Sequence, residues 1–241
     1  MENRLHAVLD EVEKARTGLA VYAVVVVVLS AACFFISEEV LRFLVRLLGR
    51  KLVAYNPAEG FLALAHISIY CGIMLSLPVG AWLLWRGAVA RWAPGWKGWG
   101  GPVILIATFL FISGVLLGYY VLLPAGIAFL VSFEGEKVSA LISARKFISF
   151  CGTMLLALGL SFEAPLISFF LARLGWLSPG LFRKRWRHAI LVCTILAAVI
   201  TPTPDLYNMT LMTLPLLCLY FVSFGIVWLV DQTRGAAGER R

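Results

Sequence analysis

Charged residues are scarce in this sequence. Asp, Glu, Lys and Arg make up 14% of the 241 residues, whereas apolar residues make up 61%. Soluble domains average about 25% charged and about 45–50% apolar residues, and a soluble fold of this size exposes too much surface to hide such an excess. The composition therefore excludes a soluble enzyme, a disordered regulator and an ordinary nucleic-acid-binding protein. It predicts an integral membrane protein.

Signatures of enzymes and metal sites are also missing. There is no HExxH motif of zinc proteases, no GxSxG nucleophile elbow and no P-loop, and the three histidines are widely dispersed. The five cysteines lie in apolar runs without a CxxC pair, which is typical of thiols that pack as small apolar side chains. Residues 38–42 resemble the EExxxR motif of membrane CAAX proteases, but Arg42 comes one residue early. We expect neither catalysis nor a metal site.

Long apolar runs are abundant. A helix needs about 20 mostly apolar residues to cross the hydrocarbon core, and the candidate segments are residues 17–36, 61–85, 102–131, 148–172, 188–201 and 210–230. The fifth is short because residues 201–205 (TPTPD) interrupt it. We predict an all-α polytopic membrane protein with six transmembrane helices, the fifth and sixth being short. Its expected parts are a cytoplasmic amphipathic segment at 1–16, a membrane domain at 17–230 and a cytoplasmic tail at 231–241.

Basic residues are distributed unevenly among the connecting segments. Of the 21 Lys and Arg residues, 14 lie in the N-terminal segment, the 86–101 and 173–187 segments and the C-terminal tail, and 7 lie in the alternate connections. Lys and Arg accumulate in cytoplasmic loops, so we expect both termini in the cytoplasm. The dense run of basic residues at 183–187 is interpreted first as a signal that fixes the orientation of the chain in the membrane. Contact with anionic lipid or with an acidic partner is the alternative. Five tryptophans between residues 82 and 99 are typical of an interfacial belt.

Two segments that flank the first span have amphipathic spacing. In residues 1–16 apolar side chains recur at helical intervals, with acidic residues on the other side, which predicts an interfacial helix. In residues 38–50 leucines recur on one face, while Arg42, Arg46 and Arg50 recur every four residues. This second pattern predicts a helix that lies along the outer membrane surface.

Glu163 is the only acidic residue deep inside a predicted span. A charged side chain at the bilayer centre costs about 2.5–3.5 kcal/mol on insertion scales, so intramembrane carboxylates are functional candidates by default. The alternative is a Glu that is hydrogen-bonded to a neighbouring helix for packing alone. Pro165 follows two residues later and can kink the helix beside it. Gly114 and Gly118 form a GxxxG motif, which predicts close helix packing in the third span.

Several motifs occur together in an order that resembles the TatC family, the core membrane subunit of the twin-arginine protein translocase. They run from about residue 54 to 220 and include the segments NPAEGF at 56–61, SLP at 76–78, GYYVLLP at 118–124, SFEAP at 161–165 and TPTPD at 201–205. The individual family-motif positions are Glu59, Pro78, Phe162, Pro165, Pro204 and Asp205.

The resemblance implies a fold and a function. The fold is a glove-like array of six helices whose concave face holds Glu163. The function is that of a receptor for the Arg-Arg signal peptides of folded precursors, which self-associates, partners small single-span Tat subunits of the TatA and TatB type, and supports transport driven by the proton-motive force. The implied location is the cytoplasmic membrane of a bacterium or archaeon. The resemblance implies no cofactor, whether nucleotide or metal.

The sequence departs from the family pattern where the twin arginines are expected to bind. The candidate signal-peptide-binding residues in the N-terminal segment are Glu11, Glu13, Lys14 and Arg16, in an ambiguous register. Glycine stands where the cytoplasmic loop after the second span has Glu in the family. Two alternatives therefore remain: a divergent TatC paralogue with narrowed or lost twin-arginine recognition, and a membrane transporter of small solutes.

Overall fold

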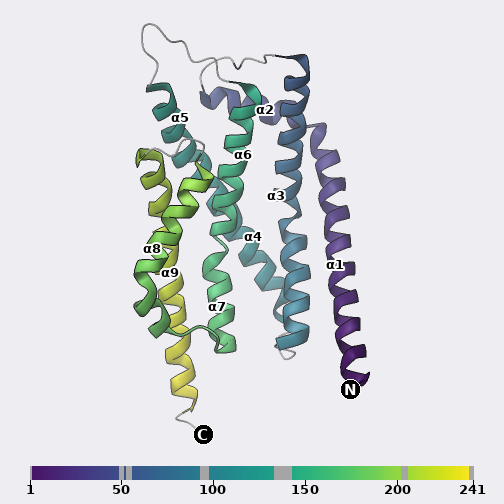
Figure 1. Cartoon of the computed structure of the whole chain (residues 1–241), viewed down its shortest axis with the longest axis vertical. Helices are drawn as coiled ribbons and strands as arrows, with labels where there is room; N and C mark the ends of the chain where they lie inside the picture. Colours follow the sequence, from purple (N-terminus) through teal and green to yellow (C-terminus); the bar gives the residue numbers. More distant parts are fainter. Residues whose placement is uncertain are drawn as a thin grey trace.

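The computed structural model describes residues 2–48, 52, 56–92, 98–132, 143–201 and 206–238, which are helical apart from short connections. The helices, shown in Figure 1, are α1 (Glu2–Phe34), α2 (Ser37–Leu48), α3 (Pro57–Trp92), α4 (Gly100–Leu117), the π-helical turn η2 (Gly118–Leu122), α5 (Leu123–Ser132), α6 (Ala144–Ser161), α7 (Ala164–Leu174), α8 (Pro179–Ile200) and α9 (Leu206–Gly238).

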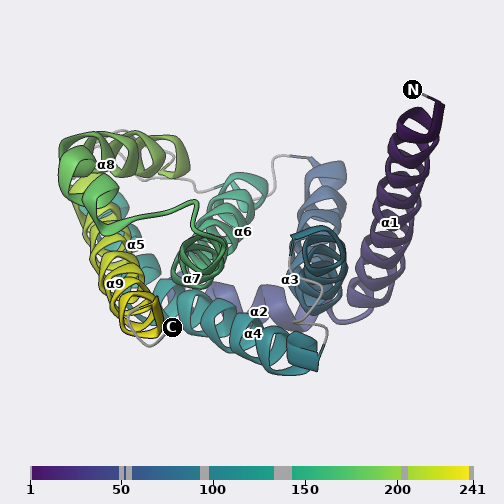
Figure 2. The same ribbon diagram turned by 90° about the horizontal axis from the view of Figure 1, so that it is seen from below.

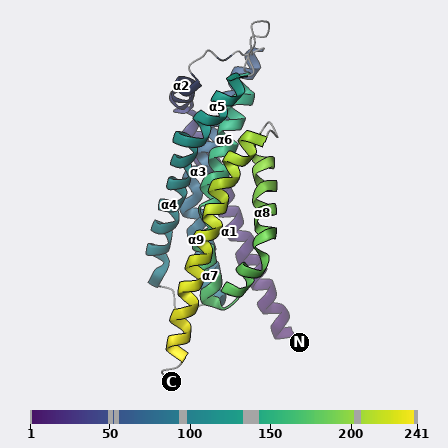
Figure 3. The same ribbon diagram turned by 90° about the vertical axis from the view of Figure 1, so that its left-hand side faces the viewer.

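The long helices form an open, curved array. Seen from one end in Figure 2, α1 lies at one edge and α8 at the other, α3, α4 and α9 lie between them, and α6 and α7 occupy the middle. Both ends of the chain lie at the same end of the bundle, whereas α2 lies at the opposite end (Figures 1 and 3). This arrangement matches the all-α fold predicted from the sequence.

Five helical segments are long and apolar enough to cross a membrane. They are residues 16–34, 58–87, 100–128, 144–174 and 206–233. The predicted fifth span corresponds to α8, whose first half carries four exposed basic residues between 183 and 187. Only its second half is continuously apolar, which agrees with a short segment.

The sixth predicted segment is not short, so this part of the prediction is wrong. Helix α9 has 33 residues and continues past Val230 to Gly238, into the expected tail. The upper ends of α8 and α9 lie below the upper ends of α3 and α6, and α9 extends beyond α7 at the other end (Figure 1).

Helix α1 packs along α3, and this pair has close contacts between small residues. A Cβ atom on Gly72 would lie 2.6 Å from Ser30 Cα, and the Ser76 hydroxyl donates to the Tyr22 hydroxyl at 3.1 Å. Helix α1 is continuous from Glu2, so residues 2–16 extend the first span and do not form a separate helix. The free face of α1 is apolar, as expected for a lipid-facing helix.

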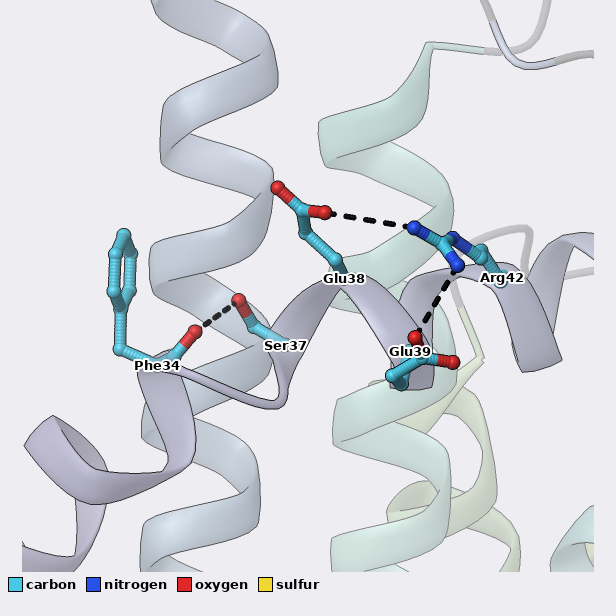
Figure 4. A network of polar contacts seen from close by, with 5 residues as sticks. All are labelled: Phe34, Ser37, Glu38, Glu39 and Arg42. Atoms are coloured by element: carbon cyan, nitrogen blue, oxygen red, sulfur yellow. Dashed lines mark hydrogen bonds and ion pairs between the residues drawn. The ribbon is translucent and has the colours of Figure 1, made fainter.

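The predicted surface helix at 38–50 is confirmed as α2. The chain turns at residues 35–36, where the Ser37 hydroxyl donates to the Phe34 carbonyl at 2.7 Å (Figure 4). Leu44 and Leu48 are buried on the inner side of α2, whereas Arg42 is exposed and pairs with the carboxylates of its first turn. The helix lies across the bundle near the upper ends of α3 and α6 (Figure 1).

Glycines bring α4 into close contact with α6, as the GxxxG motif predicts. A Cβ atom on Gly114 would lie 2.8 Å from the Leu158 carbonyl oxygen, and one on Gly118 would lie 2.9 Å from Leu155 Cδ2. On the other helix, a Cβ atom on Gly159 would lie 2.7 Å from Phe111 Cδ2. The glycines of each helix therefore pack directly against side chains of the other helix. This contact fixes the position of the segment that follows α6.

Candidate functional site: a glutamate at the break between α6 and α7

The fourth long segment is interrupted at residues 162–163, near the middle of the bundle (Figure 1). Pro165 has no N–H to donate to the Ser161 carbonyl, so the regular helical pattern cannot continue through it. The Glu163 N–H instead bonds the Leu160 carbonyl at 3.1 Å, a tighter three-residue turn. The kink predicted beside Glu163 is therefore present, and Pro165 itself is buried.

Glu163 is the N-cap residue of α7 and directly precedes Ala164, the first residue of that helix. Its side chain makes no capping hydrogen bond to the backbone, although its carbonyl accepts from the Ile167 N–H at 3.0 Å. The residue is half-buried. A carboxyl group at a helix N-terminus is placed favourably in the field of the backbone dipoles, so the break offers the one intramembrane acid a partly compensating environment.

The contact between α4 and α6 sets the direction of the residues at the break. The Phe162 ring packs against Gly114, where an added Cβ would lie 2.8 Å from its Cδ2 atom. Glu163 directly follows Phe162, so this contact also fixes where the backbone of Glu163 lies. Pro165, Ser168 and Ala172 are buried on the side of α7 that includes the α9 contact.

Two of the remaining motif positions lie on α3. Glu59, in the first turn of α3, accepts a hydrogen bond from the hydroxyl of Ser143, which is the N-cap of α6. This bond joins the starts of two helices that are far apart in the sequence. Pro78 lies half-buried inside α3, two residues after the buried Ser76 that contacts α1.

The candidate signal-peptide residues lie apart from Glu163. Glu13 and Arg16 are exposed on α1, at the edge of the array, with α3 between α1 and the middle helices (Figure 2). The side chains of Glu11 and Lys14 lie outside the part of the chain that is described, as do Pro204 and Asp205. The structure thus does not bring the N-terminal candidates and Glu163 into one site.

No cluster of three His, Cys, Asp or Glu residues that could hold a metal ion occurs within the described residues. Glu163 is a half-buried carboxyl group at a helix break, with Phe162 before it and Pro165 after it. Such a group can offer hydrogen bonds, attract water or exchange a proton, which are the ordinary roles of an acid within a membrane. Nucleophilic or metal-assisted chemistry has no support from this geometry.

The sequence of the chain matches one known protein family over most of its length. The family described as Sec-independent protein translocase protein (TatC) matches residues 10–215. The chain belongs to the TatC family. Among its relatives, the TatC protein of Carboxydothermus hydrogenoformans is 30% identical over 244 residues, which cover the whole of both chains. The TatC protein of Deinococcus radiodurans is 37% identical over 170 residues, 70% of this chain and 63% of that protein.

A solved structure confirms the TatC fold. The crystal structure of a twin-arginine translocase receptor, TatC, superimposes with a TM-score of 0.83, covering 92% of this chain and 99% of that one at 24% sequence identity. The resemblance inferred from the motif order is therefore confirmed at the level of family and fold. Members of the TatC family are membrane transport proteins, in agreement with the absence of enzyme motifs from the sequence.

Sequence reasoning missed several residues that make contacts between helices. Ser143 was not singled out, although a Ser before a helical segment is a common N-cap signal. Gly159 was also missed, because its partner Phe111 lies on a different helix and no local spacing links the two. Trp85, assigned to an interfacial belt, is buried and packs against Phe170 with ring centroids 4.7 Å apart, so that assignment is wrong for this residue.

Proposed function

We propose that this chain is the signal-peptide receptor and core subunit of a twin-arginine translocase that moves folded proteins across the cytoplasmic membrane using the proton-motive force. The observation that carries the proposal is the family match over residues 10–215, within which Glu163 stands alone at a helix break inside the membrane. The fold likeness to a twin-arginine translocase receptor supports it.

In this proposal Glu163 is the functional polar group within the membrane domain. It offers a hydrogen bond to a polar residue of a partner helix and attracts water locally, which thins the hydrophobic barrier. The partners are small single-span Tat subunits, further copies of this chain and the Arg-Arg signal peptides of folded precursors. The half-buried position of the carboxyl group supports this role, because the group stays accessible to a ligand from one side.

The proposed orientation places both termini and the basic segments 86–101 and 173–187 in the cytoplasm. The 14-to-7 distribution of basic residues supports it. The common position of both chain ends at one end of the bundle is compatible with it (Figure 1). Helix α2 then lies at the extracytoplasmic side of a bacterial or archaeal membrane.

The test is export in a strain that lacks its own TatC. The full-length chain is expressed there with its cognate small Tat subunits, and a folded reporter carries either an Arg-Arg or a Lys-Lys signal peptide. We expect export of the Arg-Arg reporter, abolished by collapse of the proton-motive force, and none of the Lys-Lys reporter. Insertion at normal levels without export of either reporter contradicts the proposal and favours a transporter of small solutes.

A paralogue that has narrowed or lost twin-arginine recognition is the second candidate. It is favoured by the glycines at 98, 100 and 101, in the loop where the family has an acidic residue. If the N-terminal acids replace that residue, the double substitution Glu11→Gln, Glu13→Gln weakens photo-crosslinking of an Arg-Arg precursor. A bidentate Arg–carboxylate contact is among the stronger polar interactions. Unchanged crosslinking in the double variant supports the paralogue, and Glu38→Gln serves as an exposed acidic control.

A further inference from the structure

An apolar groove lies beneath α2, on the part of the bundle farthest from the chain ends. It has a volume of about 300 Å³ and is lined by residues of α2, α3, α4, η2 and α6. Phe43 and Leu44 come from α2, Met74 from α3, Leu116 from α4, and Tyr119 from η2. The groove does not include Glu163, so it is separate from the site proposed above.

The walls of the groove are held in place by specific contacts. The Tyr70 hydroxyl is hydrogen-bonded to the Thr153 hydroxyl at 2.8 Å, and its ring packs on Gly152, where an added Cβ would lie 2.5 Å from Tyr70 Cγ. At the mouth, the rings of Phe43 and Tyr119 stack with centroids 4.8 Å apart and an interplanar angle of 11°. With the Tyr70 hydroxyl already bonded, the interior suits an apolar occupant.

A cation lies beside the mouth of this groove. Arg42 is engaged by two carboxylates, at 3.7 Å from Glu38 Oε2 and 3.2 Å from Glu39 Oε1 (Figure 4). Arg46 is exposed and has no ion pair within the described residues. It follows Phe43 by three positions and therefore lies next to it on the helix surface. Because the two carboxylates of α2 are already paired with Arg42, Arg46 remains available to bind an anionic lipid headgroup.

We propose that this groove binds an anionic phospholipid, with an acyl chain beneath α2 and the phosphate at Arg46. The groove is lined mainly by apolar side chains, and its Tyr70 hydroxyl is already bonded to Thr153, so the interior matches an acyl chain, which is apolar along its length. The neighbouring arginine complements the phosphate as basic residues do in other lipid-headgroup sites.

The full-length chain offers an internal control for this proposal. A second apolar groove on α1, of about 230 Å³, is lined by Ala23, Val24, Val27 and Val28. Arg16 is the nearest basic residue before it on that helix, about two turns from Ala23. The groove on α1 contacts the same bilayer, but no basic residue of α1 lies at its edge. Lipid bound there reports the general lipid environment alone.

The experiment places a photoreactive amino acid at Leu116 or at Val27 in the chain reconstituted in vesicles of phosphatidylglycerol and phosphatidylcholine. The adducts are identified by mass spectrometry. At Leu116 we expect phosphatidylglycerol adducts enriched about fivefold over the vesicle composition, the size of one arginine's attraction to an anionic lipid. At Val27 the adducts should follow the vesicle composition. Equal composition at both positions overturns the proposal, and so does a protein–protein adduct at Leu116.

Two arginine variants test the headgroup contact. Arg46→Gln should remove most of the phosphatidylglycerol enrichment at Leu116. Arg86→Gln, which alters an exposed arginine stacked near Trp82 on α3, should leave it unchanged. Circular dichroism and insertion levels establish that both variants are folded. Enrichment that persists in Arg46→Gln, or that is lost equally in both variants, contradicts the assignment of the phosphate to Arg46.

Discussion

Replacing Gly159 by alanine should destabilise the contact between α4 and α6. The new Cβ would lie 2.7 Å from Phe111 Cδ2 and Cζ, whereas ordinary contacts lie at 3.4–4 Å. The Phe111 ring is only 5% exposed, so it has little room to move away. Overpacking of this kind costs about 1–3 kcal/mol. Removing a helical glycine returns about 0.5–1 kcal/mol, so the net loss should be about 0–2.5 kcal/mol.

Gly225→Ala provides the matched control. Gly225 also lies inside a helix, α9, but no atom outside its own helix comes within 4 Å of its Cβ position. This variant should gain only the stability that comes from replacing a helical glycine by alanine, about 0.5–1 kcal/mol. The difference between the two variants is then the overpacking term of about 1–3 kcal/mol.

The assay is reversible unfolding in mixed detergent micelles, followed by far-UV circular dichroism. Phe111→Leu removes the ring that Gly159→Ala meets, so the double variant should recover part of the lost stability. Equal stability of Gly159→Ala and Gly225→Ala would refute the packing argument. Strict additivity of Gly159→Ala and Phe111→Leu would also refute it, because residues in contact are expected to couple.

Two further predictions concern stability and topology. The hydrogen bond between Glu59 and Ser143 should give a coupling of about 0.5–1.5 kcal/mol in a double-mutant cycle with alanine, and additive effects would mean that this bond contributes nothing. Reporter fusions at Arg91 and Arg241 should report a cytoplasmic location and one at Glu136 an extracytoplasmic location. The reversed pattern would contradict the span assignment.

The helical segments were largely predictable because their signal is local. Runs of apolar residues long enough to cross a membrane identify spans directly, and the leucine spacing at 38–50 identified α2. The break after α6 was also predictable, since Pro165 removes a backbone donor wherever it occurs in a helix. Glu163 stood out because a carboxylate is rare in such an apolar run.

Contacts between distant segments could not be predicted in the same way. Ser143 and Glu59 are 84 residues apart, and their bond depends on how α3 and α6 pack. Trp85 has an amphipathic side chain that suits a membrane interface equally well, and its burial depends on Val103 and Phe170 from other helices. The length of α9 was misjudged because the end of an apolar run indicates where a span ends, whereas the helix itself continues through the polar residues after Val230.

The most direct test of the central claim is export by Glu163→Gln and Glu163→Ala variants. Both should insert at normal levels, and Glu38→Gln, which changes a carboxylate 69% exposed, should export normally. If Glu163 acts by hydrogen bonding to a partner helix, as we propose, the Gln variant retains much of the export rate and the Ala variant loses it. Failure of both would assign the role to ionisation. Wild-type export by both would contradict the account, because Glu163 would then be a packing residue.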